Sequence, residues 1–317
     1  MGRHCAIDAP DAEALVEKAV AGIGAAVSAL RVPGLRGVVL GGGYGRGEGG
    51  VLVRADGSRG LSNDLDFFAV ARDGLGASGL SAIASALAPV AEEWKERLGV
   101  DVDFTVRTPR RLRRDERRLM VQELLRGHFD VAGEPGDRLF EGLAEIPASD
   151  VPWTEAVRQV ANRGAGLLFA MDRGAPALFA ARNVAKCVLG ASDAKLVARG
   201  AYRWRARARA EADGSPAVLA ALAWKSTPSE TPPCSWEEAR ALMLDAAREV
   251  FETGRASGAD RRSLREAARW VVRRRSIGPV RTFGRDCIVR LALQVRDCLE
   301  ERRPLPPGTL EDWKIFN

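Results

Sequence analysis

Two apolar segments of this chain each carry a pair of aspartates spaced two residues apart, Asp64 and Asp66 in the first and Asp101 and Asp103 in the second. Side chains alternate between the two faces of a β-strand, so the members of each pair point to the same side. Carboxylates crowded in this way repel one another unless a cation lies between them. The pattern therefore predicts strands that carry oxygen ligands for a hard divalent ion such as magnesium. The alternative, a solvated strand edge, fits the apolar neighbours less well.

A glycine-rich stretch at residues 41–50 directly follows an apolar segment at residues 37–40, which we interpret as a short buried strand. Glycines such as Gly42 and Gly43 let the backbone approach a ligand closely, and successive amides can bind an anion. Arg46 adds a positive charge to the same stretch. An ordinary turn remains the alternative interpretation. The stretch therefore indicates a phosphate-binding site only in combination with the aspartates.

The rest of the pattern divides the chain into two halves. In the first half, helical spacing and alternation of apolar residues predict helices at 11–30, 80–99 and 109–126 and strands at 37–40, 64–70, 100–106 and 129–132. From Pro152 onward helical periodicity dominates, and Ser235 and Glu238 form a capping box that begins one helix. We expect an α+β fold: a domain at 1–150 with a small mixed sheet flanked by helices, followed by a helical bundle at 151–317.

A strand, a glycine-rich turn, an Asp-x-Asp strand and a further aspartate-bearing strand follow one another in this chain. This order resembles the polymerase-beta-like nucleotidyltransferase superfamily. GGYGRGE followed by NDLDFF looks most like the catalytic domain of the uridylyltransferase that modifies the PII nitrogen-signalling protein, and VDFTV resembles the strand with the third carboxylate. The resemblance covers residues 37–132. It implies a catalytic sheet of the nucleotidyltransferase type.

The resemblance also implies roles for individual residues. Gly42 and Gly43 would approach a nucleoside triphosphate, and Arg46 would contact its phosphates. The three catalytic carboxylates would bind two magnesium ions, and the last of them would help to deprotonate the acceptor; they are Asp64, Asp66 and Asp103. Asp101 is the competitor for the third position. The stretch at 51–61 looks like an insertion relative to compact members, with the form of a flap or an extra hairpin.

Composition limits the other kinds of site. The five cysteines are scattered without a CxxC pair and there are only two histidines, which argues against a zinc site and for an oxygen-liganded metal. The net charge of +6 comes from 48 Lys and Arg residues, of which six are lysine, so an arginine-rich compositional bias explains it as well as nucleic-acid binding does. No apolar run reaches the roughly 18 residues that span a bilayer. With no secretory signal at the start, we expect a cytoplasmic protein without membrane contact.

A basic segment directly follows the second aspartate strand and contains Arg107, Arg110, Arg111, Arg113, Arg114, Arg117 and Arg118. It fits either a guide for a phosphate-rich ligand or, as we prefer, a solvated helix face. Related nucleotidyltransferases form their acceptor pocket in a helical domain beside the sheet. The resemblance therefore suggests an acceptor pocket in the second half from Arg182, Asn183, Lys186, Asp193, Lys195 and Tyr202, although helix surfaces carry such residues routinely.

The expected activity is transfer of a nucleoside monophosphate from a triphosphate, with ATP as the expected donor, to a hydroxyl of a small-molecule or protein acceptor, with release of pyrophosphate. Two alternatives stay open. One is a non-catalytic, nucleotide-binding regulatory module, which the retention of all three aspartates disfavours. The other is an RNA-directed nucleotidyltransferase or RNA-binding protein, whose affinity for RNA would depend on salt.

Overall fold

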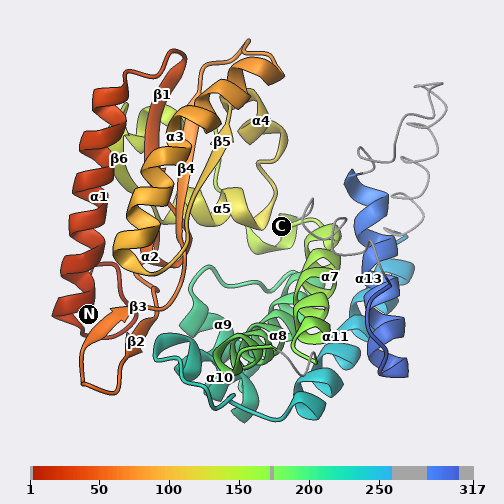
Figure 1. The fold of residues 1–317 in the computed structure, drawn as a ribbon. Helices are drawn as coiled ribbons and strands as arrows, with labels where there is room; N and C mark the ends of the chain where they lie inside the picture. Colours follow the sequence, from red (N-terminus) through yellow and green to blue (C-terminus); the bar gives the residue numbers. More distant parts are fainter. Residues whose placement is uncertain (1–2, 172–174, 259–283, 307–317) are drawn as a thin grey trace. The chain divides into compact units, whose positions relative to one another are not determined.

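The computed structural model describes residues 3–171, 175–258 and 284–306 of the chain. These residues form two compact units (Figure 1). The first comprises Met1–Ile146 with Ser226–Pro228, and the second comprises Pro147–Lys225 with Ser229–Asn317. The first unit contains the sheet and the second is helical, so the fold is α+β with a C-terminal helical bundle, as the sequence predicts.

The first unit is built on a four-stranded mixed sheet with the strand order β5-β4-β1-β6. The strands are β1 (Leu35–Leu40), β4 (Leu65–Ala71), β5 (Val102–Arg107) and β6 (Phe129–Gly133). β1 runs antiparallel to both β4 and β6, whereas β4 and β5 are parallel. Helix α3 (Ala77–Leu98) makes the crossover that parallel neighbours require.

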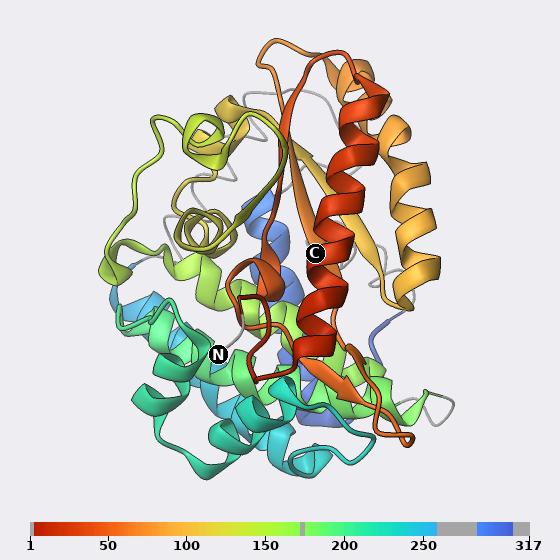
Figure 2. The ribbon, with the colours of Figure 1, turned by 90° about the vertical axis from the view of Figure 1, so that its left-hand side faces the viewer.

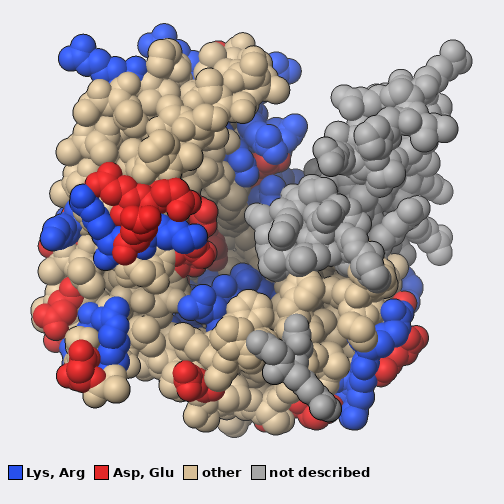
Figure 3. Space-filling model, viewed as in Figure 1, with Lys and Arg blue, Asp and Glu red and all other residues tan. Residues whose placement is uncertain are grey.

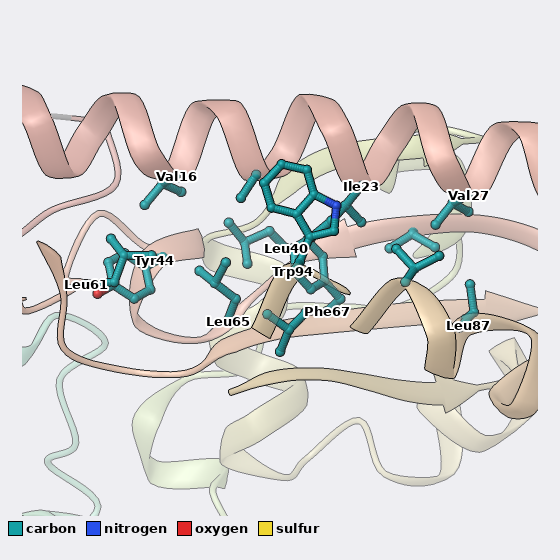
Figure 4. Packing of buried hydrophobic residues seen from close by; sticks show 14 of the residues in the cluster. Val16, Ile23, Val27, Leu40, Tyr44, Leu61, Leu65, Phe67, Leu87 and Trp94 are labelled. Atoms are coloured by element: carbon teal, nitrogen blue, oxygen red, sulfur yellow. The ribbon is translucent and has the colours of Figure 1, made fainter. Parts of the chain in front are cut away.

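One face of the sheet is covered by α3 and by α1 (Pro10–Leu30), as Figure 2 shows with the sheet seen nearly edge-on. Val16, Ile23 and Val27 of α1 lie above the sheet together with Leu87 and Trp94 of α3 (Figure 4). Alternate strand residues meet them from below; Leu40, Leu65 and Phe67 are fully buried. Full burial of such side chains is worth about 1.5–3 kcal/mol each, so this face forms the main core of the unit.

The opposite face of the sheet is covered by three short helices, α4 (Pro109–Arg114), α5 (Leu119–Arg126) and α6 (Gly136–Leu139). Val39, Phe68 and Val70 pack here against Leu112 and Leu124. Asp66 and Asp103 share this face, because they alternate with strand residues of the main core. The aspartates therefore lie on the side of the sheet away from α1 and α3.

The prediction of one basic helix at 109–126 is wrong, because the structure has two helices. α4 ends at Arg114, and Arg118 is extended with ψ of 143°. The side chain of Gln122 stabilises the break, since its Nε2 donates to the Glu116 carbonyl oxygen over 2.8 Å.

The segment at 51–61, which the resemblance suggests is an insertion, forms a two-stranded hairpin from β2 (Val51–Val53) and β3 (Arg59–Leu61). Its base packs in the main core through Val51 and Leu61, and the Arg59 side chain donates to the Asp8 carbonyl oxygen over 3.2 Å. The predicted extra hairpin is therefore present and lies against the start of α1. Its role as a flap over a nucleotide stays a prediction.

The second unit contains the 3₁₀ turn η1 (Ala148–Asp150) and the helices α7 (Trp153–Phe169), α8 (Ala177–Ala198), α9 (Ala206–Asp213), α10 (Pro216–Ser226), α11 (Trp236–Ala256) and α13 (Gly284–Glu301). α7 packs against α8, α11 and α13. The predicted capping residue Ser235 accepts a hydrogen bond from the Glu238 amide over 3.1 Å at the start of α11. Among the described residues, none of the helices is long and apolar enough to cross a membrane.

Candidate functional site

The aspartates meet where β4 and β5 begin and β1 ends. In the parallel pairing of β4 and β5, Asp66 lies directly opposite Asp103, and Asp64 immediately precedes β4. Leu40, the last residue of β1, pairs with Phe67, so the glycine-rich stretch leaves β1 beside Asp66. Three segments far apart in the sequence thus meet at this end of the sheet, which we call the carboxylate edge.

Asp101 and Asp103 differ in their surroundings. Asp101 Oδ1 accepts an ion-pair contact from Lys95 Nζ at 2.8 Å, and both side chains are largely exposed. Partial desolvation, and then the negative charges of Asp64 and Asp101, raise the pKa of Asp103. Asp103 is thus the member of the pair that lies opposite Asp66 and is influenced by Asp64. This placement favours Asp103 over Asp101 as the third carboxylate.

Gly42 lies against the carboxylate of Asp66. A Cβ atom on Gly42 would be 2.2 Å from Asp66 Oδ2, and Gly42 has φ of +62°, a conformation that L side chains rarely adopt. The Gly41 amide donates to the Asp66 carbonyl oxygen over 2.8 Å, which joins the glycine-rich stretch to β4. A side chain at position 42 would therefore displace the aspartate.

Gly43 is not constrained in this way. An added Cβ would lie 3.5 Å from the nearest atom, the Glu48 carbonyl oxygen, which is an ordinary contact distance. Gly42 and Gly43 begin the short helix α2 (Gly42–Gly45), so their amides lie outside the hydrogen bonding of that helix. Both predicted glycines thus adjoin the carboxylate edge, but only Gly42 needs to be glycine for steric reasons.

Tyr44, which the sequence analysis did not single out, holds the glycine-rich stretch in place. It is 1% exposed, and its hydroxyl donates to the Gly50 carbonyl oxygen over 2.7 Å. The Tyr44 hydroxyl oxygen in turn accepts a hydrogen bond from the Ser62 amide over 3.1 Å. Because Ser62 and Asn63 directly precede Asp64, this phenol connects the glycine-rich stretch to the start of the aspartate strand.

The segment at residues 4–6 holds the same stretch from the other side. The Gly49 amide donates to the His4 carbonyl oxygen over 3.0 Å, and the Ala6 amide donates to the Gly49 carbonyl oxygen over 2.8 Å. The Glu13 carboxylate of α1 accepts the amides of His4 and Cys5 at 3.0 and 2.7 Å. α1 thus fixes the segment, and the segment fixes the glycine-rich stretch. Sequence spacing gives no signal for these contacts.

Arg46 forms ion pairs with two glutamates of the first unit. Its guanidinium contacts Glu48 at 3.3 Å and Glu123 of α5 at 3.0 Å, and its side chain is 11% exposed. These ion pairs compensate much of its charge and connect the glycine-rich stretch to α5. A phosphate contact by Arg46 stays a prediction, and the placement of this side chain does not favour it.

Of the six residues of the predicted acceptor pocket, two meet around a third side chain in the second unit. Asp193 Oδ1 contacts Arg209 Nε at 2.8 Å, and the Arg209 guanidinium lies 4.9 Å from the centre of the Tyr202 ring. Asp193 and Tyr202 are therefore brought together around Arg209, a residue of α9 that the sequence analysis missed. Lys195 points elsewhere, because its Nζ contacts Asp245 Oδ2 on α11 at 2.5 Å.

The other three predicted pocket residues lie in the first half of α8. The Asn183 side chain donates to the Phe179 carbonyl oxygen of the preceding turn over 3.0 Å. Arg182 and Lys186 are four residues apart and thus neighbours on one side of the helix. Lys186 is exposed and Arg182 is half-buried. An acceptor pocket formed by all six residues stays a prediction.

Metal binding at the carboxylate edge depends on how the aspartates are arranged. Among the described residues, no group of three or more His, Cys, Asp or Glu side chains is arranged to hold a metal ion. Magnesium commonly uses only one or two protein carboxylates and completes its coordination with water and substrate phosphates. The adjacent Asp64, Asp66 and Asp103 fit an ion shared with a phosphate ligand better than an all-protein cage.

Comparisons with known proteins add a distant structural likeness. No family model and no curated protein matches the chain. Among solved structures it is similar to a spectinomycin adenyltransferase from Enterococcus faecialis, determined with ATP and spectinomycin, at 12% identity and a TM-score of 0.41. The match covers 75% of this chain and 97% of that chain. A likeness of this size does not establish a shared activity, and the finer resemblance to PII uridylyltransferases stays a prediction.

Proposed function

We propose that this chain transfers a nucleoside monophosphate from a nucleoside triphosphate, with ATP as the expected donor, to a hydroxyl of a small-molecule or protein acceptor and releases pyrophosphate. The observation that carries the proposal is the carboxylate edge. Asp66 and Asp103 lie opposite each other on parallel strands, Asp64 is adjacent, and Gly42 leaves room for the Asp66 carboxylate. A cluster of this kind needs cations, and a bound triphosphate brings them.

The proposal gives each group at the carboxylate edge a chemical task. Asp64, Asp66 and Asp103 would hold two magnesium ions, which neutralise the triphosphate and favour departure of pyrophosphate when bound. The amides of Gly42 and Gly43 would donate to phosphate oxygens. Asp103 would accept the proton of the acceptor hydroxyl, the role that the resemblance implies for the third carboxylate.

The acceptor is the less defined part of the proposal. By the resemblance to nucleotidyltransferases, we assign acceptor binding to the helical unit, where Asp193, Tyr202 and Arg209 form a compact polar group. Arg209 is 8% exposed, so this group supports the local fold as well as offering polar contacts. A screen of hydroxyl-bearing acceptors follows once the donor is known.

Calorimetric titration of ATP, GTP, CTP and UTP in the presence and absence of magnesium tests the donor site. We expect the wild type to bind one triphosphate in a magnesium-dependent manner and the Asp64→Ala/Asp66→Ala variant to lose that binding. Asp101→Ala is the matched control, because it removes a neighbouring carboxylate that is paired with Lys95. If no triphosphate binds at millimolar concentration, or if the double variant binds normally, the proposal fails. Binding without pyrophosphate release throughout the acceptor screen would favour the regulatory module.

A further inference from the structure

The sheet face that carries Asp103 also carries Arg107 at the other end of β5. Asp103, Thr105 and Arg107 alternate with Val102, Phe104 and Val106 of the main core, so their side chains point away from it. Arg107 Nη1 donates to the Val106 carbonyl oxygen over 3.0 Å. Its buried Nε has no hydrogen-bond partner among the described residues. A half-buried guanidinium with an unused donor on a short strand needs an explanation.

The charged surroundings of Arg107 are mostly positive. Burial, and then the neighbouring charges of Arg111, Arg118 and Arg114, lower the pKa of Arg107, and only the charge of Asp115 acts in the other direction. Asp115 is itself shared, since its oxygens lie 4.0 Å from Arg111 Nε and 3.5 Å from Arg114 Nε. Figure 3 shows basic side chains gathered over α4 with a small acidic area among them. One carboxylate at these distances does not balance the arginines around it. The cluster therefore keeps surplus positive charge; it consists of Arg107, Arg111, Arg114 and Arg118.

Arg113 provides a contrast within the same helix. Arg113 Nη2 contacts Asp73 Oδ2 at 3.2 Å, and the Arg110 backbone amide donates to Asp73 Oδ1 over 2.9 Å. Arg113 therefore has an acidic partner of its own, whereas Arg111 and Arg114 share Asp115.

We propose that Arg107, Arg111 and Arg114 bind a phosphate group of a small phosphorylated ligand. Guanidinium groups match phosphate oxygens in geometry and charge, and β5 holds the half-buried Arg107 in place. Arg107 and Asp103 are four residues apart on β5, or about 13 Å at the strand rise. The cluster is therefore separate from phosphates bound at the carboxylate edge and forms a second anion site beyond the proposed activity.

Binding of phosphate ligands in EDTA, without nucleotide, tests the site. The probes are inorganic phosphate and glycerol phosphate, titrated by calorimetry at ionic strength held constant with sodium chloride. We expect saturable binding that weakens about tenfold or more in Arg111→Gln/Arg114→Gln. These side chains are 51% and 69% exposed, so the fold tolerates the change. Arg113→Gln removes an arginine of the same helix that is paired with Asp73 and should bind as the wild type does, whereas Arg111→Gln alone should weaken binding.

Two further variants sharpen the test. Asp115→Asn removes the competing carboxylate and should tighten phosphate binding, and looser binding would overturn the proposal. Asp64→Ala/Asp66→Ala should bind phosphate normally, so the second site stands even if the proposed activity fails. Tighter binding of glycerol phosphate than of inorganic phosphate supports the small phosphorylated ligand, and the reverse order supports free phosphate at the same site.

Equal loss of binding in the Arg111→Gln and Arg113→Gln variants would overturn the proposal, because it would indicate diffuse attraction to a basic surface. Titration with a short single-stranded RNA provides the corresponding check. RNA affinity that falls equally in both variants, with no saturable phosphate binding, would assign the surface to nucleic acid instead.

Discussion

Gly42 and Gly43 are neighbours of the same type, but they differ in how closely their backbone approaches the carboxylate edge. A Cβ on Gly42 meets Asp66 Oδ2 at 2.2 Å, whereas one on Gly43 makes ordinary contacts. We expect Gly42→Ala to displace Asp66 and abolish magnesium-dependent triphosphate binding, with an added backbone cost of about 1–2 kcal/mol. Gly43→Ala is the matched control and should retain binding in the same calorimetric titration. Equal effects of the two changes would contradict the placement of Asp66.

Asp103 is expected to oppose folding in the metal-free protein. A carboxyl whose pKa is raised on folding favours the folded state while protonated, and this contribution is lost as pH rises through its folded pKa. We therefore expect Asp103→Asn to raise Tm at pH 7 without magnesium, with a gain that shrinks as pH falls to about 4. Thermal unfolding across this pH range measures the effect.

Asp101→Asn provides the comparison at the same strand, because it removes the partner of Lys95. It should leave Tm unchanged or slightly lower, since exposed ion pairs contribute little. A lower Tm for Asp103→Asn than for the wild type at pH 7 would contradict the charge crowding. The same variant should lose nucleotidyl transfer, so it separates stability from activity.

At the scale of elements, the segment at residues 4–6 connects α1 to the glycine-rich stretch. Glu13→Ala removes the carboxylate that accepts the His4 and Cys5 amides. We expect the segment to detach, so that the fully buried Cys5 thiol reacts with a thiol reagent and triphosphate affinity falls. Burial now raises the pKa of Cys5 to about 12, which suppresses the thiolate.

Mass spectrometry after labelling identifies which cysteine has reacted. Glu17→Ala, one turn further along α1 and exposed, is the control and should leave Cys5 protected. Cys187, buried in the other unit, gives an internal reference in every sample. Labelling of Cys5 at the wild-type rate in Glu13→Ala would show that other contacts hold the segment.

The elements that could be predicted from the sequence are those with a regular apolar period. α1, α3, β4 and β5 bury one side each, so their spacing shows in the sequence. The break between α4 and α5 is instead stabilised by a side-chain hydrogen bond from Gln122 to the Glu116 carbonyl oxygen, which periodicity does not contain. The four-residue helix α2 is too short to show a period.

The same distinction applies to the candidate site. The aspartates could be found because two carboxylates in an apolar strand are chemically unusual. The pairing of Asp66 with Asp103 across β4 and β5 does not follow from the alternation alone. The residues that hold the glycine-rich stretch could not be found. Tyr44 and Glu13 act through hydrogen bonds to backbone groups whose positions follow only from the tertiary fold.

At the scale of the whole molecule, the chain has two units, each with its own buried residues. Met243 of α11 is fully buried and lies close to Gly164 of α7. Met243→Ala should destabilise the helical unit by about 2–5 kcal/mol but leave triphosphate affinity unchanged, because the proposed donor site belongs to the first unit. Denaturant unfolding and calorimetry on the same sample measure both quantities.

Ile23→Ala is the matched core truncation in the first unit, where Ile23 is fully buried. It should lower the stability of the sheet unit and reduce triphosphate binding as that unit unfolds. Loss of triphosphate affinity in Met243→Ala, at a denaturant concentration where the first unit stays folded, would show that the donor site depends on the helical unit.

β5 is the outermost strand of its sheet, and it carries Asp103 at one end and Arg107 at the other. In the described part of the chain β4 is its only strand partner, so β5 can separate from the sheet at a smaller free-energy cost than the inner strands. Ligands that bind at either end of β5 would keep it paired with β4, because a ligand that binds only the paired form stabilises that form. Amide hydrogen exchange in β5 should therefore slow when magnesium and triphosphate are added, while exchange in β1 changes little. Slower exchange confined to β5 would mean that substrate binding also orders this edge of the sheet.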